Sequence, residues 1–145
     1  MNKLFRFCFI LFLFLCTEYT SAQPVTVKAR MDSTQIWIGD QTALTFEVVQ
    51  NKGQKVKMPL FSDTIVGNLE IVEQAKSDTF NIADDKVQVN VKYIVTSFED
   101  SLIYVPPFPY ISGSDTSWSN SLSLKVIQPF VIDSTSNQLA DIKPV

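Results

Sequence analysis

This 145-residue chain lacks several of the residue types and motifs on which catalysis usually depends. The chain contains no histidine, which is the usual general base near neutral pH. Its two cysteines, Cys8 and Cys16, lie in a terminal apolar run, and its four glycines form neither a nucleophile elbow nor a phosphate-binding loop. Composition does not exclude a Ser–Lys dyad, but no motif points to one. The sequence therefore predicts no enzyme, no catalytic residue and no cofactor.

Aspartates gather in the predicted turns, at Asp84, Asp85, Asp100 and Asp115. Oxygen ligands from loops suit a calcium ion. Aspartate is also favoured in turns because its side chain accepts hydrogen bonds from nearby backbone N–H groups. The chain has no D-x-D-x-D-G spacing. We therefore expect these aspartates to act in turns and predict no metal site.

Aromatic residues give the sequence its best candidates for a contact surface, because aromatic side chains concentrate at protein interfaces. Trp37 alternates with isoleucines on its predicted strand, and Phe108 and Tyr110 lie beside three prolines at a strand end. Trp118 shares a predicted face with leucines of the closing strand, which favours the core. We predict Phe108, Tyr110 and Trp37 as interface residues, with burial in the core as the alternative for any aromatic at strand spacing.

The first 22 residues have the pattern of a secretory signal. Lys3 and Arg6 precede Phe7–Cys16, an unbroken apolar run, and small residues then lead to Ala22. The run is shorter than the roughly 20 helical residues that span a bilayer. The sequence predicts a signal peptide at residues 1–22 that is cleaved, and export to the periplasm or another extracytoplasmic space.

The predicted mature chain carries a small negative charge. Removing Lys3, Arg6 and Glu18 from the 12 basic and 15 acidic residues leaves 10 and 14, a formal charge of −4. A mildly acidic domain without a basic cluster is a poor nucleic-acid binder, so we expect no nucleic-acid partner. Both cysteines leave with the signal, so the domain is expected to fold without disulfides.

The clearest strand pattern lies in Asp85–Tyr110. Apolar residues alternate there with polar ones, which is typical of a strand with one face on a core: Val87, Val89, Val91, Tyr93 and Val95. Glu99-Asp100-Ser101 is a polar break, and Leu102–Val105 resumes as a β-rich run before the prolines end it. We predict two strands joined by a tight turn.

Other short β-type segments recur between turn signals every 8–12 residues or so. They are Pro24–Asp32, Thr34–Ile38, Thr42–Gln50, Lys55–Leu60, Leu69–Gln74, Ser77–Ile82 and Trp118–Gln128. Phe61–Gly67 and Ser112–Ser117 are predicted loops. The expected fold is all-β, an immunoglobulin-like β-sandwich of about seven to nine strands over residues 23–128. Residues 129–145 are predicted to be a tail or linker.

Several short phrases, in their order along the chain, carry a family resemblance. They are Ile38-Gly39-Asp40-Gln41, Met58-Pro59, Ser62-Asp63-Thr64-Ile65, Thr96-Ser97-Phe98, Val105-Pro106-Pro107-Phe108 and Asp141-Ile142-Lys143-Pro144. On these phrases the chain resembles the extracytoplasmic N-terminal domain of BatD-type aerotolerance proteins of Bacteroidetes. The chain departs from that family at Glu99-Asp100-Ser101, a turn in which relatives often have glycine.

The resemblance implies immunoglobulin-like domains facing the periplasm, commonly followed by a membrane helix. It implies partners in the cell envelope, among them von Willebrand A-type Bat proteins, and no catalytic residues. A membrane tether is expected only if this chain is a truncated form of a longer one.

We therefore expect a non-enzymatic periplasmic domain that works by protein–protein contact in an aerotolerance or envelope-stress system. The alternative is a secreted carbohydrate- or peptide-binding module, or an adhesin subunit.

Overall fold

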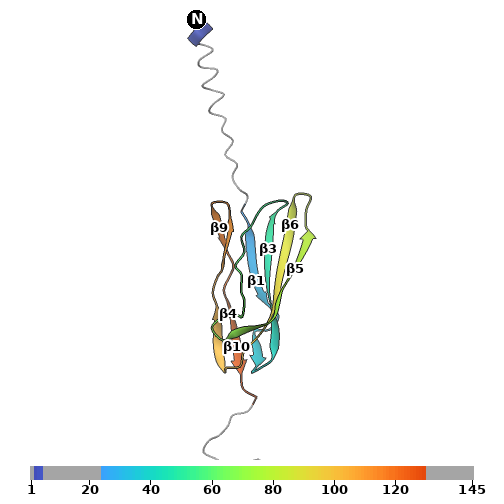
Figure 1. The fold of residues 1–145 in the computed structure, drawn as a ribbon, viewed down its shortest axis with the longest axis vertical. Helices are drawn as coiled ribbons and strands as arrows, with labels where there is room; N and C mark the ends of the chain where they lie inside the picture. The colour runs from blue at the N-terminus through green and yellow to red at the C-terminus, as the bar shows by residue number, and fades with distance from the viewer. Residues whose placement is uncertain (1, 5–23, 130–145) are drawn as a thin grey trace, which may run out of the picture.

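A computed structural model describes residues 2–4 and 24–129 and is drawn in Figure 1. The predicted signal peptide, apart from residues 2–4, and the predicted tail, apart from residue 129, lie outside the described residues. The domain between them is all-β. Its strands are Thr26–Met31 (β1), Gln35–Trp37 (β2), Gln41–Asn51 (β3), Thr64–Val66 (β4), Leu69–Asn81 (β5), Lys86–Thr96 (β6), Ser101–Val105 (β7), Pro109–Ser112 (β8), Asp115–Trp118 (β9) and Leu122–Ile127 (β10).

Three sheets make up the domain. The first has five strands in the order β1-β3-β6-β5-β4, and all of its pairs are antiparallel. The second has three strands in the order β2-β10-β7, in which β2 runs parallel to β10. The third is the β8–β9 hairpin. Apolar side chains alternate with polar ones along most strands, so one face of each sheet is available for a shared core.

The sheets pack as a β-sandwich, which confirms the predicted fold class. The order β1-β3-β6-β5 is that of strands A, B, E and D in an immunoglobulin-type domain. The segments β7–β8 and β9–β10 act as two long strands of the opposite layer, and a bridge at Lys57 adds a neighbour to β8 through Ile111. The described residues form ten strands, where about seven to nine were predicted, because irregular links divide each of these two long strands into two.

Aromatic rings fill the centre of the core, where an immunoglobulin domain often has a disulfide. Phe46 on β3 is 1% exposed, and its ring centroid lies 5.9–6.3 Å from those of four other aromatic residues: Phe61, Tyr93, Phe108 and Tyr110. Phe61 also lies edge-to-face against Phe108 at 4.9 Å. Such edge-to-face pairs are favourable beyond the area they bury. Within residues 24–129, which include no cysteine, aromatic packing therefore takes the place of that disulfide.

The predicted hairpin in Asp85–Tyr110 is wrong, although both of its strands exist. β6 pairs with β3 and β5 in the first sheet, whereas β7 pairs with β10 in the second. The polar link around Asp100 therefore passes from one layer to the other. Alternation identifies the face of a strand that is buried, but it does not identify the neighbouring strand.

Five other segments differ from the sequence prediction. Lys55–Leu60 forms only the bridge from Lys57 to Ile111, although Val56 and Met58 do pack against the core. Leu69–Gln74 and Ser77–Ile82 are one strand, β5, with two register irregularities near Glu73. The predicted loops Phe61–Gly67 and Ser112–Ser117 contain β4 and the β8–β9 turn.

Candidate functional site

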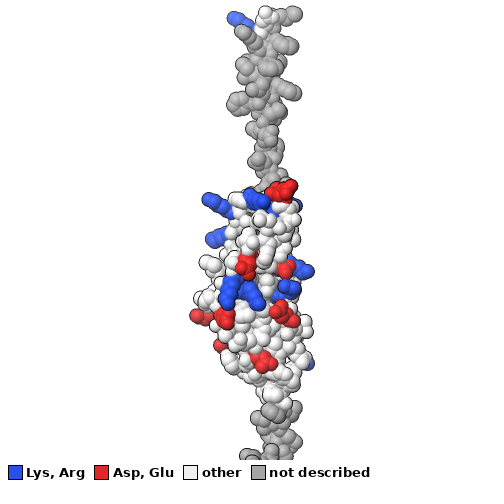
Figure 2. Space-filling view, turned by 90° about the vertical axis from the view of Figure 1, so that its right-hand side faces the viewer, with Lys and Arg blue, Asp and Glu red and all other residues white. Residues whose placement is uncertain are grey.

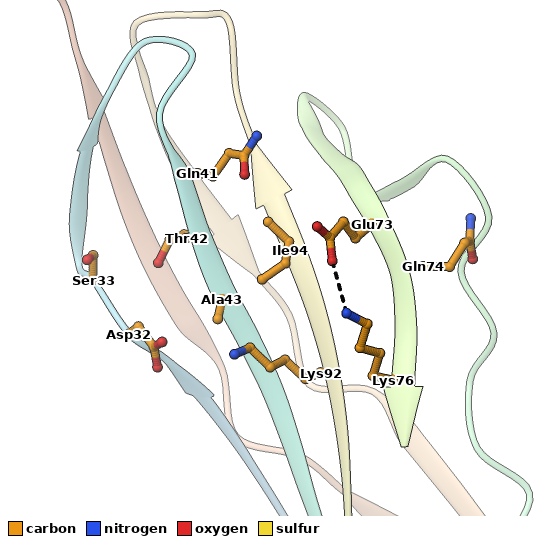
Figure 3. Close-up of a pocket in the computed structure, with 10 residues that line it drawn as sticks. All are labelled: Asp32, Ser33, Gln41, Thr42, Ala43, Glu73, Gln74, Lys76, Lys92 and Ile94. Atoms are coloured by element: carbon orange, nitrogen blue, oxygen red, sulfur yellow. Dashed lines mark hydrogen bonds and ion pairs between the residues drawn. The ribbon is translucent and has the colours of Figure 1, made fainter. Parts of the chain in front are cut away.

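The outer face of the first sheet has a groove of about 430 Å³, drawn in Figure 3. Ala43 on β3 and Ile94 on β6 are directly opposite in the sheet and form its apolar floor. Polar residues of β3, β5, β6 and the β1–β2 link line the rest: Asp32, Ser33, Gln41, Thr42, Glu73, Gln74, Lys76 and Lys92. The groove is therefore a polar trough over a narrow apolar floor.

An irregularity in β5 shapes one wall of the groove. The pairing of β5 with β6 shifts register between Ile71 and Glu73 and again between Glu73 and Lys76. An extra residue in one strand of a pair bends that strand and turns its side chains in new directions. As a result Glu73 and Lys76 face each other, with Nζ of Lys76 3.5 Å from Oε2 of Glu73 (Figure 3).

Two lysines are adjacent in this groove. Lys76 is directly opposite Lys92 in the β5–β6 ladder, an arrangement of like charges that destabilises a sheet. The exposed ion pair with Glu73 offsets it little, because exposed pairs contribute only about 0–1 kcal/mol. The ion pairs among the described residues leave Lys92 without a carboxylate partner. The groove can therefore accept a further negative charge.

The groove offers polar contacts rather than an assembled set of catalytic groups. Across residues 2–4 and 24–129, no group of three or more histidine, cysteine, aspartate or glutamate side chains is placed to hold a metal ion. The arrangement suits weak binding of a polar or charged group to the sheet surface.

Of the three predicted interface residues, Tyr110 belongs to the core. Its side chain is 2% exposed and packs against Phe46, so it is not accessible to a partner in this fold. Burial, followed by repulsion from an ionised Tyr93, raises its pKa above the usual value near 10. Burial also raises the pKa of Tyr93. Both phenols therefore stay protonated at any pH near neutrality.

Phe108 is half-buried and packs against Phe46 and Phe61, so little of it is accessible. Trp37 is 47% exposed and is the predicted residue that remains available for contact. The prolines before Tyr110 end β7, and β8 then restarts with Tyr110 facing inward. A strand end can therefore turn its aromatic residues into the core.

Trp118 is exposed, contrary to the prediction that it lies in the core. Its side chain is 60% exposed at the end of β9. The link between β9 and β10 is not strand, and within it Ser119 is buried instead, where its hydroxyl accepts a hydrogen bond from the Phe108 N–H at 2.9 Å. The face of Trp118 therefore cannot be extrapolated from Leu122 and Leu124.

The outer face of the second sheet brings Trp37 together with two apolar residues that the sequence prediction missed. On β7, Ile103 and Val105 point inward, and Leu102 and Tyr104 point outward with 72% and 59% exposure. We call Trp37, Leu102 and Tyr104 the second-sheet patch. The exposure of Leu102 and Tyr104 could have been predicted from the strand assigned to Leu102–Val105, because alternate residues of a strand with one buried face point to solvent.

Strand pairing places the second-sheet patch around one charge. Lys125 on β10 is opposite Leu102 on one side and Gln35 on the other, and Ile127 is opposite Trp37. Adjacent strands lie about 4.8 Å apart, and every member of the patch lies on a strand directly beside β10. The result is an exposed apolar surface with one cation on β10, and exposed apolar patches on soluble domains mark interaction sites.

No described helix is long and apolar enough to cross a membrane. Comparison with protein-family models, with curated proteins and with solved structures found no match for this chain.

Proposed function

We propose that this chain is a non-enzymatic, extracytoplasmic domain that binds another protein of the cell envelope through the second-sheet patch. The observation that carries the proposal is the exposure of Trp37, Leu102 and Tyr104 on one face of a three-stranded sheet. Large apolar side chains cost free energy when they stay in water, and clusters of them mark contact surfaces on soluble domains.

The family resemblance supports the same proposal and suggests the class of partner. BatD-type proteins are associated with von Willebrand A-type proteins in the envelope, so we expect a partner of that kind in an aerotolerance or envelope-stress system. The secretion signal predicted from the sequence supports an extracytoplasmic location.

Affinity capture from envelope extracts tests the proposal. Immobilised wild-type chain should recover one specific protein, and a Trp37→Ala/Tyr104→Ala variant should lose it. Trp118→Ala is the matched control, because Trp118 is an exposed tryptophan on β9 in a different sheet. Recovery that survives the double substitution, or that is lost equally in the Trp118 variant, would contradict the proposed surface.

A carbohydrate-binding module is the second candidate, because Trp37 and Tyr104 both expose aromatic rings on which a sugar can stack. A glycan array separates the two candidates. Binding of a defined glycan that Trp37→Ala abolishes, together with no protein recovered from envelope extracts, would favour the carbohydrate module and contradict protein binding.

A further inference from the structure

At one edge of the first sheet, the short strand β4 covers only the beginning of the long strand β5. β4 pairs with Glu70 and Leu69 at the start of β5, and the N–H of Ile71 donates to the carbonyl of Asp63 at 2.8 Å. The side-chain amide of Gln74 then donates to the carbonyl of Ser62 at 3.0 Å. Beyond this point no strand of the described residues pairs with the outer side of β5. We call residues 75–81 the open edge.

The open edge is exposed along its whole length. Every second residue of an edge strand directs its backbone N–H and C=O away from the sheet, so the open edge presents unpaired donors and acceptors. β5 lies at the right-hand margin of Figure 1, and Figure 2 faces that margin. Basic and acidic side chains are interspersed on this face in Figure 2, rather than separated into blocks of one sign.

The opposite edge of the first sheet is closed by a side chain. Oδ1 of Asn120 accepts a hydrogen bond from the N–H of Ala29 at 2.8 Å, and its Nδ2 donates to the carbonyl of Ala29 at 3.1 Å. The amide therefore satisfies both backbone groups of a β1 residue, as a neighbouring strand would. Strand addition to the first sheet is thus directed to β5.

The sequence of the open edge is complementary to itself. If two copies of β5 run antiparallel about a two-fold axis at Ser77, then Ser77 faces Ser77 of the second copy. Lys76 then faces Asp78 of the second copy, and the same pair forms again on the other side of the axis. Opposite charges directly across two strands stabilise their pairing. The next pair is Ala75 with Thr79, which are both small enough to avoid a clash.

This register also relieves the repulsion between Lys76 and Lys92. Lys76 is opposite Lys92 on β6, and Asp78 is opposite Asn90. In the paired sheet Lys76 would have the carboxylate of a second Asp78 on its other side. The two-fold axis thus places an anion next to each lysine pair without burying an unpaired charge.

Other registers are disfavoured. An axis at Asp78 would put two aspartates directly opposite each other, which is destabilising. A register that pairs Lys76 with Glu73 of the second copy would extend the pairing to Ile71. The N–H of Ile71 already donates to the carbonyl of Asp63, and β4 pairs with the residues just before it.

We propose that two copies of this chain associate through their open edges, β5 against β5, in the register centred on Ser77, to form one continuous ten-stranded sheet. The interface is separate from the second-sheet patch, because it uses the first sheet and leaves the second exposed. Each copy contributes the same surface, which gives a closed dimer rather than a filament.

Charge exchange tests the register. In sedimentation-velocity measurements the full chain should form a dimer whose population increases with concentration. Lys76→Asp or Asp78→Lys alone should give monomers, because each places like charges across the interface. An equimolar mixture of the two variants should restore a dimer containing one copy of each. Lys55→Asp, which makes the same charge change at an exposed loop residue, should leave the dimer intact.

Cross-linking locates the axis. In a background with Cys8→Ser and Cys16→Ser, Ser77→Cys should form a disulfide-linked dimer on mild oxidation, because residues directly opposite in an antiparallel pair have Cα atoms about 4.5–5.5 Å apart, within disulfide range. Thr79→Cys should not, since its own counterpart is several residues away. A wild-type chain that stays monomeric, a dimer unaffected by the charge substitutions, or cross-linking of Thr79→Cys in preference to Ser77→Cys would each overturn the proposal.

Discussion

At the scale of single residues, Phe46 carries the densest packing of the core. It is nearly fully buried and its ring contacts four other aromatic rings. Truncating a buried phenylalanine removes its transfer free energy and leaves a cavity, so Phe46→Ala should lower the free energy of unfolding by about 3–5 kcal/mol. Urea denaturation followed by circular dichroism measures this. Phe98→Ala, at an exposed phenylalanine, is the control and should change stability by less than about 1 kcal/mol.

Tyr110 makes the stability of the fold sensitive to alkaline pH. Its pKa in the folded chain is raised by burial, whereas in the unfolded chain it is about 10. The folded state therefore holds this proton more tightly. The contribution of Tyr110 to the free energy of unfolding is fully present below pH 10. It is lost as the pH rises above 10, because loss of the proton then stabilises only the unfolded chain.

Tyr110→Phe removes the group that ionises and keeps the ring. The wild-type chain should lose free energy of unfolding between about pH 10 and 11.5, and the variant should lose less over that range. Denaturation curves at both pH values provide the test. An equal loss in the two proteins would mean that Tyr110 does not control alkaline unfolding.

The same residues show how far a sequence prediction of the site can go. Trp37 is exposed because Ile36, the adjacent residue of its short strand, faces the core, and its interface role stays a prediction. Tyr110 and Trp118 were placed on the wrong side because each lies next to an irregular link, where period two no longer predicts which face is buried. The proposed role of Lys76 and Asp78 could not be predicted from the sequence, because it depends on β5 lying at an edge of the sheet.

At the scale of elements, Asn120 joins β1 to the link between β9 and β10. Its side-chain amide makes the two hydrogen bonds with the backbone of Ala29 that a neighbouring strand would otherwise make. Asn120→Ala should leave these two backbone groups unpaired in the protein and lower the free energy of unfolding by about 1–2 kcal/mol. Hydrogen exchange should show faster exchange at the amide of Ala29.

The control for that prediction is Asn68→Ala. Asn68 donates to Oε2 of Glu99 at 2.6 Å, but the bond is exposed and joins two side chains. Water can replace it at little cost, so stability should change by less than about 0.5 kcal/mol. Equal effects of the two substitutions would show that the Asn120 amide has no special role at the β1 edge.

Element identity was easier to predict from sequence than element pairing. The buried faces of β1, β3 and β6 follow directly from their alternation, as in Leu44, Phe46 and Val48. The partners of β6 and β7 could not be predicted, because they depend on which layer the link at Asp100 enters. Lys55–Leu60 has strand-like alternation, yet only Lys57 finds a backbone neighbour.

At the scale of the whole molecule, the N-terminal pattern predicts processing. The exported chain should begin at Gln23, because small residues at positions 20 and 22 suit the signal peptidase. Intact-mass spectrometry of the exported protein measures this directly. Ala22→Arg should block cleavage, whereas Gln23→Asn, just beyond the site, should not. An exported wild-type chain that retains its first 22 residues would contradict the prediction.

The two proposed surfaces together predict bivalent binding. A dimer formed through β5 presents two second-sheet patches, so both can engage a surface densely coated with the envelope partner. Bivalency raises apparent affinity by about 10²–10⁴ when both sites reach their targets, without any new contact. Lys76→Asp, which breaks the dimer, should therefore weaken binding to a dense surface by that factor and leave binding to a sparse surface unchanged. Trp37→Ala should weaken both, and Lys55→Asp neither. If Lys76→Asp weakened binding equally at both densities, the open edge would itself contact the partner, and the assignment of partner binding to the second-sheet patch alone would be wrong.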